Sequence, residues 1–319
     1  MIRELFRQKV ADQEPLALRW IDLPGLVHAT RVLESKERGI APPGRLSSVG
    51  RLIQAVLVRK PLPRLLFVLG APRSGTTFLG DCLGALEDVE YHFEPVGTKR
   101  ANQHVVRGDW SDRRARVTFE TVYRCLLDRS TDARFFADKT PRLCFIVEHL
   151  ARWFPDALFI LINRDGRDVA VSLREKDWYS GGLKHGRREA GGETCGPYPR
   201  VWVDASDAQR FQSMSDIRRC ISVWRYHTES AQRQLAQLDP ARWLEVRYED
   251  LAGQPTAAAE RMIRFLGLED PRQHQAFVEA CGAVRTTSVG RWRKALTTDE
   301  IEEVHEEAGA LLEAMGYPR

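Results

Sequence analysis

Three runs of consecutive apolar residues stand out along the chain, at residues 65–69, 135–137 and 157–162. Each run is of strand length and shows no alternation of apolar and polar positions, which is typical of strands buried on both faces of a sheet. Apolar positions at spacings of three and four lie between these runs and predict helices. The pattern therefore predicts an α/β fold with a central, mainly parallel sheet flanked by helices.

The pattern also divides the 319 residues into unequal parts. Residues 1–60 are expected to be helical pieces broken at Pro15, at Pro24 and at the turn of residues 42–44, and to form an N-terminal extension packed on the core. Residues 61–319 are expected to be a single domain, ending in a helix that Thr298 would cap. Residues 176–215 are rich in glycine, arginine and aromatic residues without periodicity, which predicts either a lid or acceptor-binding loop, or surface filler.

A glycine turn at residues 70–75 follows the first apolar run, and a helical pattern begins at Thr76. Such a turn directs backbone N–H groups and the positive end of a helix dipole at one point, which predicts a phosphate site. The spacing is that of a Walker-type loop, but Thr76 stands where that loop has lysine, which argues against ATP or GTP hydrolysis. Arg73 is the cation instead, and it favours a substituted 5′-phosphate. The alternative is an ordinary capping turn, with Ser74 or Thr76 as N-cap.

A second cationic position follows the third run. Arg164 comes directly after the strand predicted at 157–162, and Ser172 lies two turns into the next helix, so that both can hold one anion. Arg167 and Asp168 are expected to form a local ion pair. Two phosphate-type sites on neighbouring strands suggest a nucleotide that carries phosphates at two positions.

Candidates for proton transfer stand near the ends of two other strands. Glu94 follows an alternating segment and is a candidate general base, although a solvated loop glutamate is the plainer interpretation. His92 is its rival, and an isolated histidine is more often structural. Lys139 ends the run that begins at residue 135 and is placed to reach a phosphate, unless it is a solvated turn lysine. Residues 282–296 form a basic, aromatic loop that can close over a nucleotide.

Composition adds limits rather than a function. A formal charge of +4 suits an anionic small molecule and is too weak to argue for nucleic acid. No apolar run is long enough to span a bilayer, and charged residues within the first ten leave no room for a signal peptide, so a cytoplasmic protein is expected. The six cysteines show no metal-binding spacing, and those at 82, 125, 144 and 220 lie in apolar helical patterns and are expected to be buried free thiols.

Together, these residues resemble the sulfotransferase family that uses 3′-phosphoadenosine 5′-phosphosulfate (PAPS). The resemblance spans roughly residues 64–296, and residues 70–77 look like the family's 5′-phosphosulfate loop in its PRSGTT form. Residues 163–172 are similar to its 3′-phosphate motif through Arg164 and Ser172. Other segments match landmarks of the family: residues 138–141, 248–251, 265–268 and, as a looser late nucleotide loop, 288–292.

The resemblance implies a P-loop-type fold of three layers and in-line transfer of a sulfuryl group from PAPS to an acceptor hydroxyl, with an amine as second choice. Glu94 falls where carbohydrate- and tyrosyl-protein-type members carry their catalytic glutamate. His92 stays as the alternative because cytosolic small-molecule members use a histidine. Arg73 and Lys139 would neutralise charge on the bridging oxygen and the leaving 5′-phosphate.

The nucleotide contacts are likewise implied by the resemblance. The backbone N–H groups of residues 74–77 would hold the 5′-phosphate. The residues implied to bind PAPS are Arg73, Ser74, Gly75, Thr76, Thr77, Arg164, Ser172, Gly290, Arg291 and Trp292. No metal is implied, because the site lacks an acidic pair that would hold Mg²⁺. The acceptor is expected to be a small molecule or a carbohydrate- or lipid-like hydroxyl compound. Two alternative functions remain for the protein: a non-catalytic nucleotide-binding protein of this fold and a P-loop kinase.

Overall fold

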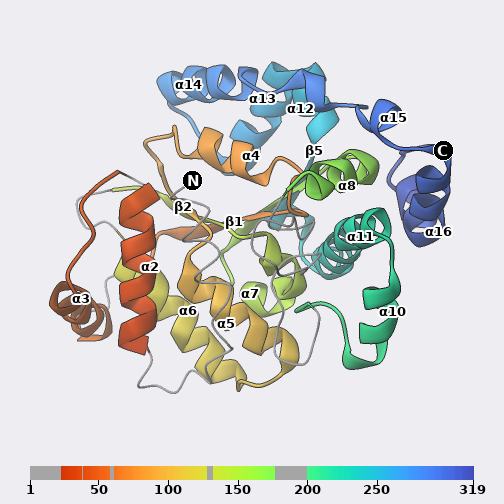
Figure 1. The fold of residues 1–319 in the computed structure, drawn as a ribbon. Helices are drawn as coiled ribbons and strands as arrows, with labels where there is room; N and C mark the ends of the chain where they lie inside the picture. The colour runs from red at the N-terminus through yellow and green to blue at the C-terminus, as the bar shows by residue number, and fades with distance from the viewer. Residues whose placement is uncertain (1–22, 38, 58–60, 128–131, 177–199) are drawn as a thin grey trace.

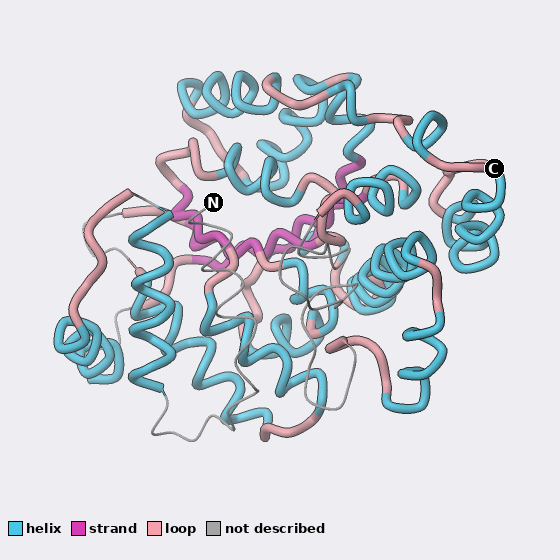
Figure 2. Tube along the Cα trace, in the orientation of Figure 1, coloured by secondary structure: helices cyan, strands magenta, loops and turns pink. Residues whose placement is uncertain are grey.

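The structure is a computed structural model that describes residues 23–37, 39–57, 61–127, 132–176 and 200–319. Within these ranges, a single five-stranded sheet lies between layers of helices (Figures 1 and 2). The strand order is β2-β3-β1-β4-β5, and every neighbouring pair is parallel. The strands are β1 (Arg64–Leu69), β2 (Val89–Phe93), β3 (Phe135–Lys139), β4 (Leu158–Asn163) and β5 (Trp243–Arg247). The prediction of an α/β fold with a mainly parallel central sheet is confirmed.

The apolar runs are buried on both faces because successive side chains of a strand point to opposite sides. In β1, Leu65, Phe67 and Leu69 join the core under one helix layer, whereas Leu66 and Val68 join the core under the other. The first layer contains α5 (Val96–Arg107), α6 (Asp112–Leu126), α7 (Val147–Trp153) and part of α11 (Asp216–Leu235). The second layer contains α4 (Thr76–Leu83), α12 (Tyr248–Gly253), α13 (Pro255–Leu266) and α14 (Pro271–Gly282).

A third apolar cluster lies beside the sheet, where α11 packs on α8 (Gly166–Arg174) and on the C-terminal helix α16 (Thr298–Ala314). The expected cap of α16 was wrong by one residue. Thr297 is the N-cap, and its hydroxyl accepts from the N–H of Glu300 while the Glu300 carboxylate accepts from the N–H of Thr297. This reciprocal pair satisfies two donors at once, and Thr298 therefore begins the helix.

The N-terminal extension contributes two described helices, α2 (Leu23–Glu37) and α3 (Arg45–Leu57). α2 packs on α5 and α6, and α3 packs on α2 and α6 (Figure 1). Pro24 was expected to break a helix, but it lies in the first turn of α2, where a missing N–H costs no hydrogen bond. The expected break at residues 42–44 is confirmed, because these residues lie between α2 and α3. The third expected break, Pro15, lies outside the described residues.

Residues 176–215 are only partly the loop that was expected. Residues 177–199 lie outside the described ranges, as does Cys195. The end of the segment is helical, with a 3₁₀ turn at Ala205–Asp207 and α10 (Ala208–Ser213), because Phe211 packs against Val203 and Met214 in a small core of its own. Residues 282–296 are likewise not a plain loop, since they contain a 3₁₀ turn at Thr286–Ser288 and the short helix α15 (Trp292–Ala295).

Candidate functional site

One edge of the sheet gathers the charged residues that the sequence indicated. Because all five strands are parallel, their C-terminal ends lie at the same edge. Glu94 follows β2, Lys139 ends β3, Gly70 follows β1, Arg164 follows β4 and Tyr248 follows β5. Residues from five separate stretches of sequence therefore meet at the position where open α/β sheets bind ligands.

The glycine turn approaches its neighbours too closely for any side chain at two positions. Gly70 has φ +146° and lies against the carbonyl oxygen of Ile162. Gly75 has φ +97°, and a Cβ atom there would lie 2.6 Å from Cδ2 of Tyr248. Glycine is required here both for the left-handed backbone and for the close approach.

The N-terminus of α4 has no side-chain cap. The capping alternative for Ser74 and Thr76 is therefore not what the structure shows. The Ser74 hydroxyl is buried and has no hydrogen-bond partner among the described residues. The N–H of Ser74 donates to the carbonyl of Ala71 at 3.1 Å, so it is already used within the turn, contrary to the expectation for residues 74–77. The first N–H groups of the helix, from Thr76 onward, have no carbonyl partner within it. An uncapped helix start beside an unsatisfied buried hydroxyl fits an oxyanion such as a phosphate.

The two predicted cationic positions lie next to each other. The Arg73 Nε donates to Ser172 Oγ at 3.1 Å, and Arg164 Nη1 donates to the carbonyl of Arg73 at 3.2 Å. The Arg164 guanidinium also stacks 4.7 Å from the ring centroid of Tyr248 and donates to the carbonyl of Ser288. Its Nε is buried without a partner among the described residues. The turn after β1 and the start of α8 thus form one continuous cationic surface.

Asp168 attaches the late loop to this surface. Its carboxylate accepts from the N–H of Gly290 at 2.7 Å and from the N–H of Trp292 at 3.0 Å. The expected ion pair between Arg167 and Asp168 was wrong, because Arg167 pairs with Asp165 at 2.8 Å instead. The Arg167 guanidinium lies 3.9 Å from the ring centroid of Trp292, which is buried. Arrangement of this loop therefore depends on α8.

The remaining late-loop candidate, Arg291, extends toward α8 and forms an ion pair with Glu175. About a third of the Arg291 side chain is accessible. The structure brings residues 290–292 to the rim of the cationic surface through α8.

Glu94 is held by two ammonium groups. Its carboxylate lies 2.9 Å from Lys139 Nζ and 3.0 Å from Lys99 Nζ. Burial by itself would raise the pKa of Glu94, but Lys139 and Lys99 together bring that pKa well below its ordinary value. Glu94 has φ +41°, and Arg73 has φ +75°; they are the non-glycine residues with positive φ in the described part of the chain. Such strained backbone persists where surrounding contacts enforce it, often at functional sites.

His92 occupies a different environment from Glu94. It is buried, stacks on Phe136 with 4.1 Å between ring centroids, and has carboxylates at both ring nitrogens. Glu34 on α2 contacts Nδ1, and Glu90 lies 3.1 Å from Nε2. Burial by itself lowers the pKa of His92, but the two carboxylates outweigh it and raise the pKa above its ordinary value. His92 thus joins the N-terminal extension to β2.

Several residues of the site were not predicted from the sequence. Lys99 is one, and its signal was a lysine one turn into the helix that follows Glu94. Asp138 is another: it is buried, and it accepts from Tyr123 at 2.8 Å and from Thr140 at 2.6 Å. Burial raises the pKa of Asp138 to about 6 despite these hydrogen bonds. Asp138 therefore fixes the backbone that presents Lys139.

Three features concern the described residues as a whole: metal-binding groups, helices long enough to cross a membrane, and the state of the cysteines. No group of three or more histidine, cysteine, aspartate or glutamate side chains within them is arranged to hold a metal ion. None of their helices combines the length and the apolar character that crossing a bilayer requires. Cysteines 82, 125, 144 and 220 are buried free thiols, as expected, and Cys281 is a fifth.

Comparison with known proteins agrees with this geometry. Residues 63–283 match the model of the sulfotransferase domain family. The nodulation protein NoeE of Sinorhizobium fredii is 26% identical over 298 residues, which are 81% of this chain and 67% of that protein. Protein-tyrosine sulfotransferase 2 of Gallus gallus is 24% identical over 261 residues, 76% of this chain. The matched part is 60% of the Gallus gallus protein, so the chain spans less than two thirds of that relative.

Solved structures show the same fold. Sulfotransferase STF9 from Mycobacterium avium superposes with a TM-score of 0.52 at 18% identity, covering 85% of this chain and 82% of that one. The sulfotransferase domain from the curacin biosynthetic pathway gives 0.50 at 15% identity, covering 79% of this chain and 98% of that one. A family match over more than two thirds of the sequence, with its motifs assembled at one sheet edge, shows that this chain belongs to the sulfotransferase family.

Proposed function

We propose that this protein transfers a sulfuryl group from PAPS to a hydroxyl group of an acceptor, and releases 3′,5′-PAP. The observation that carries the proposal is the contact of Arg164 with Arg73, which joins a 5′-phosphate loop to a second anion position. A donor with phosphates at both ends of one nucleoside matches two adjacent cationic positions. A nucleoside triphosphate would instead need positive charge along its chain of phosphates, from a loop lysine and Mg²⁺.

The loop residues would hold the 5′ end of the donor. The uncapped start of α4 and the unsatisfied Ser74 hydroxyl supply donors for the phosphosulfate. Arg73 supplies positive charge beside them. Arg164 and Ser172 would bind the 3′-phosphate, and the buried, unpartnered Nε of Arg164 is a donor still available for it. Gly290, Arg291 and Trp292 would cover the nucleotide from the late loop.

Glu94 would act as the general base. The acceptor oxygen attacks the sulfur, the bond between sulfur and the bridging oxygen breaks, and the acceptor proton passes to the carboxylate. Its low pKa keeps Glu94 ionised at neutral pH, but it also makes the carboxylate a weak base. Lys139 would connect donor binding to the basicity of Glu94. When PAPS binds, its phosphate would attract the Lys139 ammonium group, the ion pair with Glu94 would weaken, and the pKa of Glu94 would rise. His92 is the weaker candidate, since both of its nitrogens already contact carboxylates.

The acceptor is proposed only as a chemical class. A small-molecule, carbohydrate- or lipid-like hydroxyl fits a carboxylate base, and the Gallus gallus relative is named for sulfation of protein tyrosine, which is also a hydroxyl. We assign acceptor recognition to residues 176–215, which follow α8 in sequence, and to the N-terminal extension, whose Glu34 contacts His92. A cytoplasmic location remains part of this proposal.

The test is a screen of acceptor pools with PAPS labelled in its sulfuryl group, with and without EDTA, together with calorimetric titration of PAP and ATP. We expect transfer of the label to persist in EDTA. We also expect the protein to bind PAP in preference to ATP. Tight PAP binding without transfer to any pool would indicate a non-catalytic binder. Preference for ATP with Mg²⁺ would indicate a kinase and overturn the proposal.

A further inference from the structure

Helix α3 exposes an apolar face. Leu46, Val49, Ile53, Val56 and Leu57 follow one another at spacings of three and four, which places them on one side of the helix. We call these five residues the α3 stripe. Leu46 is 88% exposed and Leu57 is 76% exposed. Outside the stripe, the exposed large apolar residues of the described chain are Ile40 and Val289 alone.

The opposite face of α3, which packs on the protein, is more polar than the stripe. Ser48 is buried there and contacts Nδ1 of His28 at 3.0 Å and Nη1 of Arg31 at 3.3 Å. Arg51 donates to the carbonyl of Leu127 at 2.7 Å.

A helix at the surface of a soluble domain normally turns its apolar side inward. α3 packs inward through these hydrogen bonds and through a small apolar cluster, in which Leu52 and Ala55 meet Val27 and Cys125. The larger apolar side chains of the stripe lie outside this cluster and stay exposed in the described part of the chain.

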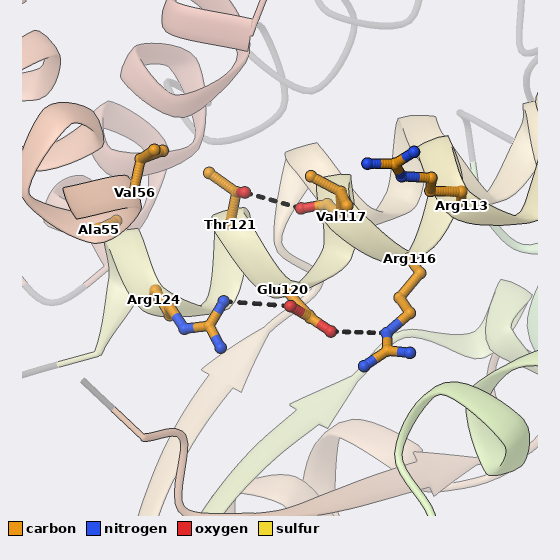
Figure 3. A pocket seen from close by; sticks show the side chains of 8 residues that line it. All are labelled: Ala55, Val56, Arg113, Arg116, Val117, Glu120, Thr121 and Arg124. Atoms are coloured by element: carbon orange, nitrogen blue, oxygen red, sulfur yellow. Dashed lines mark hydrogen bonds and ion pairs between the residues drawn. The ribbon is translucent and has the colours of Figure 1, made fainter. Parts of the chain in front are cut away.

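The surroundings of the stripe are basic. Residues 39–57 contain no acidic residue, and Arg45 directly precedes the stripe. An open pocket of about 280 Å³ lies between α3 and α6, and its lining includes Ala55 and Val56 of α3 and three arginines of α6 (Figure 3). These are Arg113, Arg116 and Arg124.

One carboxylate lies among the arginines of this pocket. Glu120 accepts from Arg116 at 2.8 Å and from Arg124 at 3.1 Å (Figure 3). Arg45 and Arg113 have no carboxylate partner among the described residues. Arg45, at the start of α3, and Arg113, in the lining of the pocket, thus carry positive charge that no described carboxylate neutralises.

We propose that the α3 stripe lies on a bilayer that contains anionic lipids, with the apolar side chains at the acyl boundary and the arginines at the phosphates of the headgroups. An apolar face flanked by arginines is the pattern of helices that lie in the membrane interface. Each basic group near an anionic surface adds attraction, and this attraction is screened by salt. A second copy of the chain fits less well, because a two-fold interface places the same basic residues against each other.

The test measures sedimentation of the full chain with vesicles of phosphatidylcholine alone, and with vesicles in which about one third is phosphatidylglycerol. Binding to the anionic vesicles is expected, and it should weaken as salt is raised. Ile53→Asp should reduce this binding about tenfold or more, because it places a charge in the apolar face. Arg113→Glu should reduce it roughly fivefold or more through lost attraction to phosphate.

Two matched variants serve as controls on α13, which lies away from α3 (Figure 1). Ala257→Asp and Arg264→Glu make the same charge changes at exposed positions and should bind like the unchanged chain. Thermal unfolding of all four variants checks that each is folded. Equal sedimentation with neutral and anionic vesicles, no sedimentation, or unaltered binding by the two α3-side variants would each overturn the proposal. A dimer in light scattering that Ile53→Asp dissociates, without vesicle binding, would assign the stripe to a second copy.

Discussion

The Nη1 atom of Arg164 donates a hydrogen bond to the carbonyl oxygen of Arg73 at 3.2 Å, although 91 positions separate the two residues in the chain. The contact exists because β1 and β4 are neighbours in the sheet and their C-terminal ends lie side by side. It makes one binding surface out of the glycine turn and the start of α8.

Replacement of Arg164 tests the second anion position. Arg164→Ala should weaken PAP affinity roughly tenfold to a hundredfold, the usual effect of losing a charge-assisted hydrogen bond to a phosphate. Titration calorimetry with PAP measures the change. Arg264→Ala is the control, because Arg264 is largely exposed on α13. Normal PAP affinity in Arg164→Ala would remove this residue from the 3′-phosphate site.

Replacement of Glu94 separates catalysis from binding. Glu94→Gln should lower turnover by about 10²–10⁴-fold, because the amide cannot accept the acceptor proton. PAP affinity should be retained or increased, since Lys139 and Lys99 lose a competing carboxylate. Label transfer and calorimetry on the same preparation measure both quantities. Turnover equal to that of the unchanged chain would exclude Glu94 as the base.

His92 should affect stability rather than turnover. Its pKa in the folded protein is raised, so its ion pairs stabilise the fold fully below the unfolded value of about 6.5 and are lost as pH rises through the folded pKa. His92→Gln should therefore lower the unfolding temperature most at pH below that value, and least in alkaline solution. Thermal unfolding followed by circular dichroism across this range is the measurement. A large loss of turnover with unchanged stability would instead favour His92 as the base.

Gly75 provides a test of the turn. Gly75→Ala should destabilise the fold by about 1–3 kcal/mol and weaken PAP binding, because φ +97° strains an alanine and its Cβ would collide with Tyr248. Gly253→Ala is the matched control, since a Cβ there meets nothing within 4 Å. Chemical denaturation of both variants gives the comparison. Equal stability of the two would mean that the turn can relax around a side chain.

The strands and the glycine turn could be predicted because their signals are local. An apolar run such as residues 65–69 specifies burial on both faces without reference to any distant residue. The turn carries its own signal in Gly70 and Gly75, whose backbone angles suit glycine. The candidates at strand ends, such as Lys139, followed from the parallel sheet alone.

Partners were harder to predict than positions. Arg167 was expected to pair with Asp168. Asp165 is also close to Arg167 in sequence, and only packing decides which of the two carboxylates pairs with it. In the structure, Asp168 is occupied by the backbone of the late loop, 122 and 124 positions away. The ion pairs of Glu94 and the carboxylates around His92 likewise depend on how β2 meets β3, α5 and α2.

Local sequence was enough to predict the buried strands, the long amphipathic helices, the sharp turn at residues 70–75 and the charged residues at strand ends. Periodicity and turn chemistry act within a few residues, so these features need no knowledge of the rest of the chain. Only the tertiary structure decided that Arg164 meets Arg73, that Glu94 is held by two lysines, and that the α3 stripe stays exposed. Each of these depends on strand order and helix orientation, which are set by the packing of the whole domain.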